Sequence, residues 1–418
     1  VKKFSNFWEN CYKLIENNKK LVRSEKRSLI NLSSVSKKIF LLSYSDYIYK
    51  KITSNYNNYM RIEDLVYEVN KITPFLTPSK HQISLEQKKS LSHKKGIEID
   101  QGIFLSSVLA NTKSGTHLCE AMLRPSNLAL QNLENFNKTG FVDFGKAYLK
   151  KKEKYIEVVL DNPEYLNAED ESTLYPLEAA IDIALLSNDR NICVLRGSKV
   201  KHKKYKNKKV FGSGINLTHL YEGKISFMWY LVREMGAVHK VFRGIHNSSK
   251  SMNSIFFPNI EKLWIGAVET FAIGGACQYL LVLDHIIAEK KAFMLLPARK
   301  EGIIPGAANL RLWRFLGDRP SRQAIQNGLK IKASDKNGKK ICDTIVNTET
   351  LDEALSIVLR SYNNSGVIGA TYNRRALRFS QETLDQFREY IAYYSHDQAN
   401  CHLSDELVSN LKKYWKNR

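Results

Sequence analysis

Apolar residues recur every three or four positions through much of the first 150 residues, which is the spacing of an amphipathic helix. Residues 85–109 and 117–136 show this spacing most clearly. No catalytic motif falls in this part of the chain. We therefore predict an accessory helical domain over residues 1–150, packed on a core or on a neighbouring subunit.

The pattern changes near Tyr155, where short apolar runs begin to alternate with helical periodicity. The predicted strands are 155–161, 191–197, 263–269 and 291–296, and the predicted helices are 173–187, 225–243, 277–288 and 305–317. The helix 173–187 carries Leu174, Leu177, Ile181 and Leu185 on one face. Strands that alternate with helices indicate an α/β fold with largely parallel strands. We place a catalytic core at residues 151–343 and, where helical periodicity returns, a C-terminal helical region at 344–418.

The chain carries 64 lysine and arginine residues against 42 acidic ones, a formal net charge of +22. Such an excess fits nucleic-acid binding, but it also arises from genomic composition, so the charge alone does not decide. The most apolar stretch, 264–288, is interrupted by polar residues, and the first residues lack the features of a signal peptide. We expect a soluble cytoplasmic protein with no membrane partner.

Cysteine and histidine spacing gives no sign of a metal centre. The six cysteines are scattered without a CxxC pair, and the ten histidines form no HExxH motif. We expect reduced thiols and no built-in metal.

Two glycine turns carry the candidate chemistry. The first is FGSGINL at 211–217, and the second is AIGGACQ at 272–278, at the start of a predicted helix. Small residues let a ligand approach the backbone, and the first amides of a helix have no partner within it. Two such N–H groups aimed at one oxygen form an oxyanion hole. Taken singly, each turn fits a packing role equally well.

The two turns, about sixty residues apart and followed by EGIIPGAANLRL at 301–312, resemble the signature order of the crotonase (enoyl-CoA hydratase/isomerase) superfamily. The resemblance covers about residues 155–331 and implies a crotonase-type ββα spiral core with helical additions at both ends. It also implies that the amides of Ile215 and Gly275 hold a thioester oxygen. Their neighbours Gly214, Asn216 and Gly274 would line the same substrate site.

Two positions argue against hydration. Hydratases of this superfamily keep one glutamate after the second turn and another in a Pro-Glu pair, and they need both for water addition. This chain has Gln278 and Ala298 there. Glutamine is no base and alanine offers no proton, so ordinary hydration is chemically disfavoured.

The same combination resembles a subgroup, the cofactor-independent (3,5-dihydroxyphenyl)acetyl-CoA 1,2-dioxygenases of dihydroxyphenylglycine and antibiotic biosynthesis. The matching segments are 97–104, 121–125, 166–170, 210–217, 271–278, 296–312 and 387–398. The resemblance implies an enolate that reacts directly with O2, with no metal or organic cofactor. It further implies polar substrate contacts from Glu169, Arg233 and Gln278 and a contact from Gln398. Apolar residues suited to an oxygen pocket are Leu217, Ala298, Ile303 and Ile304.

A basic loop precedes the first turn. Seven lysines fall within residues 199–209, and lysine binds phosphate as a point charge. The subgroup has a His-x-x-Tyr element here, matched by His202 and Tyr205 around Lys203 and Lys204. We interpret the loop as a clamp for coenzyme A, although a solvated lysine-rich loop has the same composition.

Several alternatives stay open at this point. Another crotonase-fold enolate reaction, such as thioester hydrolysis or isomerisation, would use the same turns without O2. An inactive CoA-binding or nucleic-acid-binding protein would use the basic surface, but both oxyanion turns are retained, so we expect no nucleic-acid partner. The resemblance implies a homotrimer or hexamer. The residues alone identify neither the proton-abstracting base nor the aryl substituents.

Overall fold

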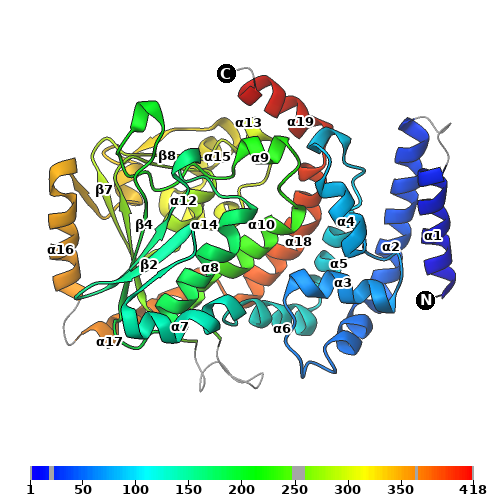
Figure 1. The fold of residues 1–418 in the computed structure, drawn as a ribbon, viewed down its shortest axis with the longest axis horizontal. Helices are drawn as coiled ribbons and strands as arrows, with labels where there is room; N and C mark the ends of the chain where they lie inside the picture. The colour runs from blue at the N-terminus through cyan, green and yellow to red at the C-terminus, as the bar shows by residue number, and fades with distance from the viewer. Residues whose placement is uncertain (1, 18–22, 247–258, 363–365, 417–418) are drawn as a thin grey trace. The chain divides into compact units, whose positions relative to one another are not determined.

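The computed structural model describes residues 2–17, 23–246, 259–362 and 366–416 (Figure 1). The chain divides into two compact units. We call residues 1–122, 221–231 and 384–408 the helical unit, and residues 123–220, 232–383 and 409–418 the sheet unit. One of the points at which the chain passes from one unit to the other, between residues 231 and 232, falls within helix α10 (Phe227–Arg233).

A seven-stranded sheet forms the centre of the sheet unit, in the order β1-β2-β3-β4-β5-β7-β10. The strands are β1 (Phe141–Asp143), β2 (Ala147–Lys151), β3 (Ile156–Leu160), β4 (Ile192–Gly197), β5 (Leu263–Val268), β7 (His285–Glu289) and β10 (Thr344–Val346). From β3 to β10 all neighbours are parallel, whereas β1, β2 and β3 are antiparallel. Strands β4 and β5 are buried throughout because helices cover both faces, which explains their continuous apolar runs. The predicted α/β class with largely parallel strands is confirmed.

The sheet begins earlier than the expected boundary at residue 150. Strands β1 and β2 form an antiparallel pair whose residues alternate between buried and exposed positions, ahead of the first parallel strand. Five residues with lysines on the exposed face give a weak strand signal, so the sequence pattern did not reveal them.

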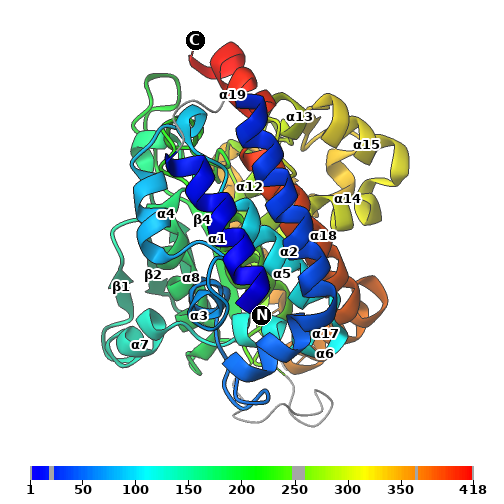
Figure 2. The ribbon, with the colours of Figure 1, turned by 90° about the vertical axis from the view of Figure 1, so that its right-hand side faces the viewer.

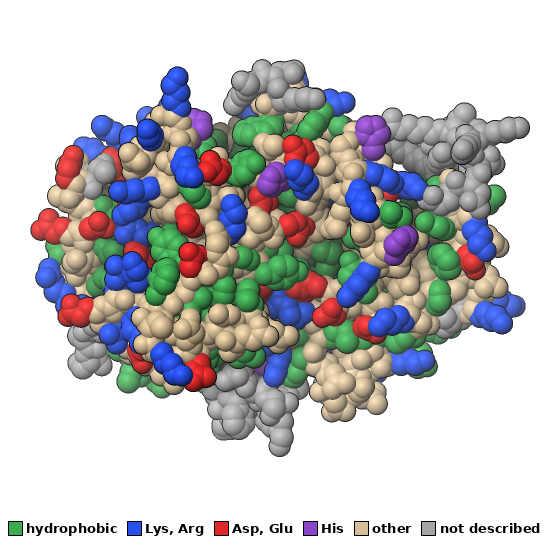
Figure 3. Space-filling view, viewed as in Figure 1, with side chains coloured by type: hydrophobic (Ala, Val, Ile, Leu, Met, Phe, Trp, Pro, Cys, Tyr) green, Lys and Arg blue, Asp and Glu red, His purple; other side chains and the backbone are tan. Residues whose placement is uncertain are grey.

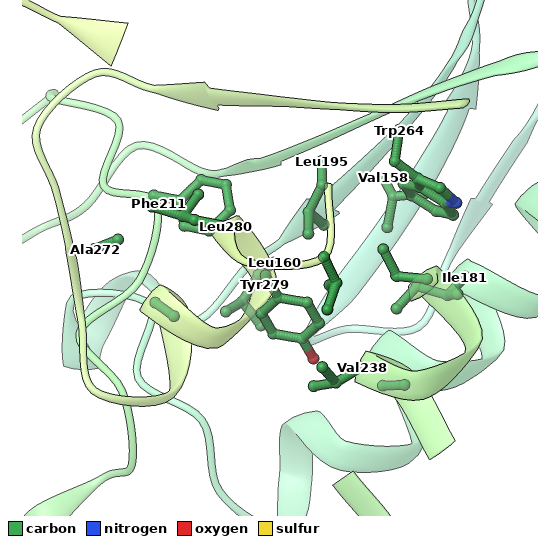
Figure 4. Packing of buried hydrophobic residues seen from close by; sticks show 14 of the residues in the cluster. Val158, Leu160, Ile181, Leu195, Phe211, Val238, Trp264, Ala272, Tyr279 and Leu280 are labelled. Carbon is green, nitrogen blue, oxygen red and sulfur yellow. The ribbon is translucent and has the colours of Figure 1, made fainter. Parts of the chain in front are cut away.

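Helix α8 (Glu171–Leu186) packs on one face of this sheet, and α16 (Leu351–Tyr362) packs on the other (Figure 1). All four leucine and isoleucine residues predicted to share a face of α8 are buried. Figure 4 shows Ile181 of α8 against Val158 and Trp264 of the sheet. Burying one such side chain contributes about 1.5–3 kcal/mol, so this layer is a main source of stability.

A second, three-stranded sheet carries one of the glycine turns. Strand β6 (Phe271–Ile273) pairs parallel with β8 (Phe293–Leu295), which pairs antiparallel with β9 (Ile331–Lys332). Helix α12 (Gly275–Leu280) follows β6 directly. Further helices of this unit are α7 (Asn127–Thr139), α9 (Leu217–Tyr221), α13 (Ala298–Glu301), α14 (Ala308–Leu316), α15 (Asp318–Asn327) and α17 (Val367–Gln381).

The predicted helix 277–288 is wrong in its second half. Helix α12 ends at Leu280, and His285–Glu289 form strand β7 between β5 and β10. Asp284 accepts a hydrogen bond from the Trp264 amide at 2.8 Å, which fixes the chain at the edge of β5. A short apolar run with two isoleucines fits either element by periodicity, and only the gap between two strands decides it.

The predicted helix 225–243 is confirmed, but it contains one wider turn. Helix α10 (Phe227–Arg233) continues through a π-helical turn (Glu234–Val238) into α11 (His239–Arg243). Lys240 of α11 is fully buried and paired with Glu178 at 2.7 Å and with Asp182 at 2.8 Å. Such π turns are rare and concentrate at functional sites.

The helical unit confirms the predicted character of the N-terminal part. It contains α1 (Lys2–Asn17), α2 (Arg23–Ile52), α3 (Ile62–Ile72), α4 (Lys80–Gln87), α5 (Ile99–Ala110), α6 (Thr112–Met122) and most of the C-terminal helices α18 (Leu384–His402) and α19 (Asp405–Leu411). Helices α1 and α2 lie side by side, and the Trp8 indole N–H donates a hydrogen bond to the Ser36 hydroxyl oxygen at 3.1 Å (Figure 2). Helices α5 and α18 touch at Gly102, where an added Cβ would lie 2.6 Å from the Ser395 carbonyl oxygen. Among the helices described, none has an apolar run that would span a bilayer.

Candidate active site

The two glycine turns lie against each other in the sheet unit. Gly212 and Ala272 form a parallel bridge, and the Ile273 amide donates to the Gly212 carbonyl at 3.0 Å. Gly214 has φ +80°, and a Cβ there would lie 2.8 Å from the Ile273 carbonyl oxygen and 3.2 Å from the Gly275 nitrogen. Only glycine permits both this backbone conformation and this approach.

The amides of Ile215 and Gly275 are both available to a ligand. Glu169 bridges the first turn, because its amide donates to Gly214 at 2.7 Å and its carbonyl accepts from Asn216 at 2.8 Å. This bridge uses the groups on either side of Ile215 and leaves the Ile215 N–H on the opposite side. Gly275 is the first residue of α12, where an N–H has no acceptor within the helix. In the described ranges neither N–H donates to a protein atom, as an oxyanion hole requires.

Glu169, Arg233 and Gln278 form one buried cluster beside these turns. Arg233 donates to Glu169 from Nε and from Nη2, each at 2.8 Å, and from Nη1 to the Gln278 side-chain oxygen at 2.6 Å. Its Nη2 also reaches the Gly275 carbonyl oxygen at 2.7 Å. All three side chains are at least nine-tenths buried, so Glu169 and Arg233 are not the solvated charges that composition alone suggests.

The electrostatics of this cluster follow from burial and pairing. Burial by itself would lower the pKa of Arg233, but the facing Glu169 charge outweighs it and the pKa is raised. Arg233 also stacks over the Tyr279 ring at 4.8 Å. Burial, and then the Glu169 charge, raises the pKa of Tyr279 well above its usual range. Arg233 thus stays a cation and Tyr279 a neutral phenol at any physiological pH.

The PGA turn at 305–307 lies against the Gln278 side chain of this cluster. A Cβ at Gly306 would lie 2.6 Å from the Gln278 Oε1 atom and 2.6 Å from the Glu234 Oε2 atom. Arg311, on α14, donates to Glu234 at 3.1 Å and to both oxygens of Glu382 at 3.0 Å. The sequence pattern does not single out Glu234, Arg311 or Glu382. An Arg-Glu pair within a helix carries no sign of burial, since periodicity assigns charges to the solvent face.

The two positions where hydratases keep glutamates hold no acid in this site. Gln278 accepts from Arg233, and Ala298 is buried at the start of α13. Glu301, one turn further on, has a pKa raised to about 7 by burial. Leu217 begins α9, and Ile303 and Ile304 follow α13; all three are half-buried. The oxygen pocket that these residues were predicted to form stays a prediction.

The basic loop is a small hairpin whose stem is the bridge between Lys199 and Lys209. A 3-10 turn (Lys203–Tyr205) forms its tip, and the His202 side chain accepts from the Lys204 amide at 3.2 Å to cap it. Tyr205 packs edge-on against Phe271, the first residue of β6, with ring centroids 5.2 Å apart. His202, Lys203 and Lys204 are exposed. The loop therefore presents its lysine side chains to solvent, while the packing of Tyr205 on Phe271 holds it in place.

Two predicted substrate contacts have other neighbours in the structure. The Asn216 side chain donates to Asp170 at 2.9 Å and accepts from the His219 amide at 3.2 Å, so it organises the start of α9. Gln398 is buried on α18 within the helical unit. Their contacts with substrate stay predictions.

The described residues include no group of three or more His, Cys, Asp or Glu side chains placed to hold a metal ion. The six cysteines are unpaired thiols, five of them buried.

Comparisons with known proteins agree with this geometry. Residues 150–386 match the enoyl-CoA hydratase/isomerase family. The chain is 37% identical over 361 residues to a (3,5-dihydroxyphenyl)acetyl-CoA 1,2-dioxygenase of Amycolatopsis orientalis, which covers 86% of this chain and 82% of that relative.

Solved structures show the same fold. An enoyl-CoA hydratase from Bacillus halodurans superposes with a TM-score of 0.53 at 17% identity, covering 64% of this chain and all of the hydratase. An enoyl-CoA hydratase from Mycobacterium avium subsp. paratuberculosis K-10 gives 0.52 at 14% identity, covering 66% and 97%. The predicted crotonase-type core with helical additions is confirmed.

Proposed function

Because this chain belongs to the enoyl-CoA hydratase/isomerase (crotonase) family, we propose that it is an enzyme that forms an enolate from an arylacetyl-CoA and passes it to O2. The observation that carries this proposal is the pair of free amides, Ile215 and Gly275, beside a cluster that keeps Gln278 in place of an acid. The likeness to a dioxygenase of this family supports the choice of reaction.

The proposed reaction begins with loss of a proton from the carbon between the aryl ring and the thioester. The enolate oxygen lies between the Ile215 and Gly275 amides, whose fixed dipoles stabilise the developing charge more than the starting carbonyl. The enolate carbon transfers electron density to O2, and the resulting peroxide attacks the thioester carbonyl. The C–S bond then breaks as the peroxide closes a four-membered ring. The O–O bond of this ring breaks as the second Cα proton is lost to solvent, and the products are an aryl glyoxylate, free coenzyme A and one proton.

The proposed mechanism explains why position 278 holds a glutamine and not an acid. Gln278 Oε1 accepts from Arg233, which orients the amide so that its Nε2 atom is the donor toward the site. An amide donor holds a substrate oxygen without giving the enolate a proton. Buried Ala298 and the half-buried Ile303 and Ile304 supply apolar surface for O2. The favoured substrate is (3,5-dihydroxyphenyl)acetyl-CoA, by analogy with the relative.

The hairpin 199–209 fits the phosphates of coenzyme A. Six of its seven lysines lie exposed, around a turn anchored by Tyr205 and directly before the first oxyanion turn, whereas Lys209 is half-buried. Acidic and basic side chains are interspersed on the face shown in Figure 3, with no continuous cationic stripe, so we do not propose a nucleic-acid partner.

We also propose a homo-oligomer, and α17 supplies the observation. This helix turns Arg374 and Arg378 inward, where they pair with Glu261, and leaves Ile368, Tyr372 and Phe379 more than 60% exposed. Apolar surface of this kind marks an interface. Sedimentation of the parent and of Tyr372→Glu/Phe379→Glu tests it: the parent sediments as a trimer or larger, and the variant as a smaller species. A parent that sediments as a monomer would remove this proposal.

One experiment tests the reaction. Protein treated with a chelator and desalted is mixed with (3,5-dihydroxyphenyl)acetyl-CoA, and O2 consumption and free thiol are followed together. We expect equal amounts of both, and neither with butyryl-CoA, which lacks the aryl group that delocalises the enolate. Thiol release without O2 consumption would instead identify a thioester hydrolase. Activity that is lost on chelation and restored by one metal would contradict the cofactor-free mechanism.

A further inference from the structure

One carboxylate oxygen of Glu234 accepts a hydrogen bond, whereas the other is unpaired among the described residues. The residue is 1% exposed, and its Oε1 accepts from Arg311 at 3.1 Å. Its Oε2 has no hydrogen-bond partner among the described residues, and the Arg233 Nη1 atom lies 4.0 Å from it. A buried acceptor left unsatisfied destabilises the folded state, and a charged one does so more strongly. Buried polar atoms are nearly always paired, so this exception needs an explanation.

The unpaired Oε2 atom borders the space beside Gly306 and the Gln278 side chain. A Cβ at Gly306 would lie 2.6 Å from the Glu234 Oε2 atom and within 2.8 Å of both polar atoms of the Gln278 side chain. Oε2 and the Gln278 amide therefore border the same spot, which the glycine leaves without a side chain. The π-helical turn that begins at Glu234 contributes, because a wider turn lets the consecutive residues Arg233 and Glu234 both face inward.

The neighbouring carboxylates of Glu169 and Glu382 have both oxygens hydrogen-bonded to arginine. Both oxygens of Glu169 accept from Arg233, and both oxygens of Glu382 accept from Arg311. Glu301 makes no described contact with Arg233 or Gln278. Among the described carboxylates that border this spot, only Glu234 combines an arginine that holds one oxygen in place with a second oxygen that is unpaired and can bond a proton.

We propose that Glu234 is the general base that removes the Cα proton, an inference that rests on the proposed enolate chemistry. The C–H bond at Cα breaks, its electron pair forms the enolate held by the Ile215 and Gly275 amides, and the proton bonds to Oε2. Arg311 stays on Oε1 and fixes the orientation of the carboxylate. When the C–S bond later breaks, the thiolate of coenzyme A takes up this proton and leaves as the thiol. The helix segment at Glu234 thus supplies the carboxylate that positions 278 and 298 lack.

The test separates proton removal from reaction with O2. The parent and Glu234→Gln are incubated with (3,5-dihydroxyphenyl)acetyl-CoA in D2O without oxygen, and deuterium at Cα is measured by mass spectrometry. Glutamine keeps the volume and an oxygen for Arg311, so the variant is expected to fold. We expect exchange, and O2 uptake in a parallel aerobic assay, to fall about 100-fold or more, with substrate affinity within about threefold.

A matched control removes a buried carboxylate elsewhere. The Glu261 side chain is as buried as that of Glu234 and pairs with Arg374 and Arg378, so Glu261→Gln should lose stability yet retain the parent's exchange rate. If Glu234→Gln does not fold, Glu234→Asp replaces it, because the shorter side chain withdraws the oxygen from the site. A folded Glu234 variant that exchanges within about threefold of the parent overturns the assignment. A parent that neither exchanges nor consumes O2 overturns the proposed function itself, and the base assignment with it.

Discussion

Arg233 holds Glu169 through two parallel hydrogen bonds, Nε to Oε2 and Nη2 to Oε1, each 2.8 Å long and wholly inside the sheet unit. The two residues are 64 positions apart in the sequence. The pair lies directly against the second oxyanion turn, since a Cβ at Gly275 would be 3.0 Å from atoms of both. Its rigidity therefore fixes the position of one proposed donor.

Breaking this pair should destabilise the protein strongly. Glu169→Gln leaves the buried Arg233 charge without its counter-ion, and removal of one partner of a buried pair typically costs about 3–5 kcal/mol. Urea unfolding followed by circular dichroism measures the loss. The double variant Glu169→Leu/Arg233→Met, which removes both charges, should recover most of the stability without activity. A Glu169→Gln protein as stable as the parent would show that the pair contributes little.

The role of the Gly275 N–H group can be tested by comparing two substitutions, one that removes it and one that keeps it. Gly275→Pro deletes the N–H, and proline suits the first position of a helix, so α12 should still form. Gly275→Ala adds the same crowding at Cβ but keeps the N–H. Loss of one oxyanion donor should lower kcat in the proline variant by about 100-fold to 1000-fold. Equal rates in the two folded variants would mean that the Gly275 amide is not a donor.

The hairpin lysines should affect binding rather than chemistry. Phosphate contacts hold substrate and transition state equally, so alanine at Lys203, Lys204 and Lys206 should raise KM for the CoA ester and weaken its dependence on salt, with kcat nearly unchanged. Alanine at the exposed helical lysines 71, 80 and 138 serves as the charge-matched control. If the control raises KM as much, the effect is only one of net charge.

Restoring both acids tests why they are missing. Gln278→Glu/Ala298→Glu places two carboxylates near the reacting carbons, where they should share protons, raise one pKa and bring water into the apolar region. We expect O2 uptake to fall steeply while exchange of the Cα proton survives or increases, measured together by an oxygen electrode and by deuterium incorporation. Undiminished O2 uptake by a folded double variant would remove the main chemical support for a dioxygenase.

Glu301 should make stability depend on pH. Burial raises its pKa from 4.5 to about 7, so the folded state binds this proton more tightly than the unfolded state does. Its ionisation opposes folding: the cost is absent below pH 4.5, grows between pH 4.5 and 7, and is complete above pH 7. Glu301→Gln should therefore raise Tm at pH 8 and leave it unchanged near pH 4. An equal shift at both values would exclude this cause.

The chemistry of the loops was determined by the sequence itself. The two glycine turns, Gln278 and Ala298 are local features, because which groups a position offers depends on residue type and not on neighbours in space. Helix α8 and strands β3, β4 and β5 were also predictable, since each is long enough for its periodicity to differ from the alternatives.

Tertiary structure alone decided the rest. The run His285–Glu289 became a strand because β5 and β10 flank it, and β1 and β2 formed because β3 offered an edge. No local pattern predicts that Arg233 is buried, since a buried charge is tolerated only where Glu169 and Gln278 arrive from elsewhere in the chain. Glu234 was missed for the same reason. Its proposed role depends on the difference between its two oxygens, because Oε1 accepts a hydrogen bond from Arg311 and Oε2 is unpaired among the described residues. This difference exists only after the chain has folded.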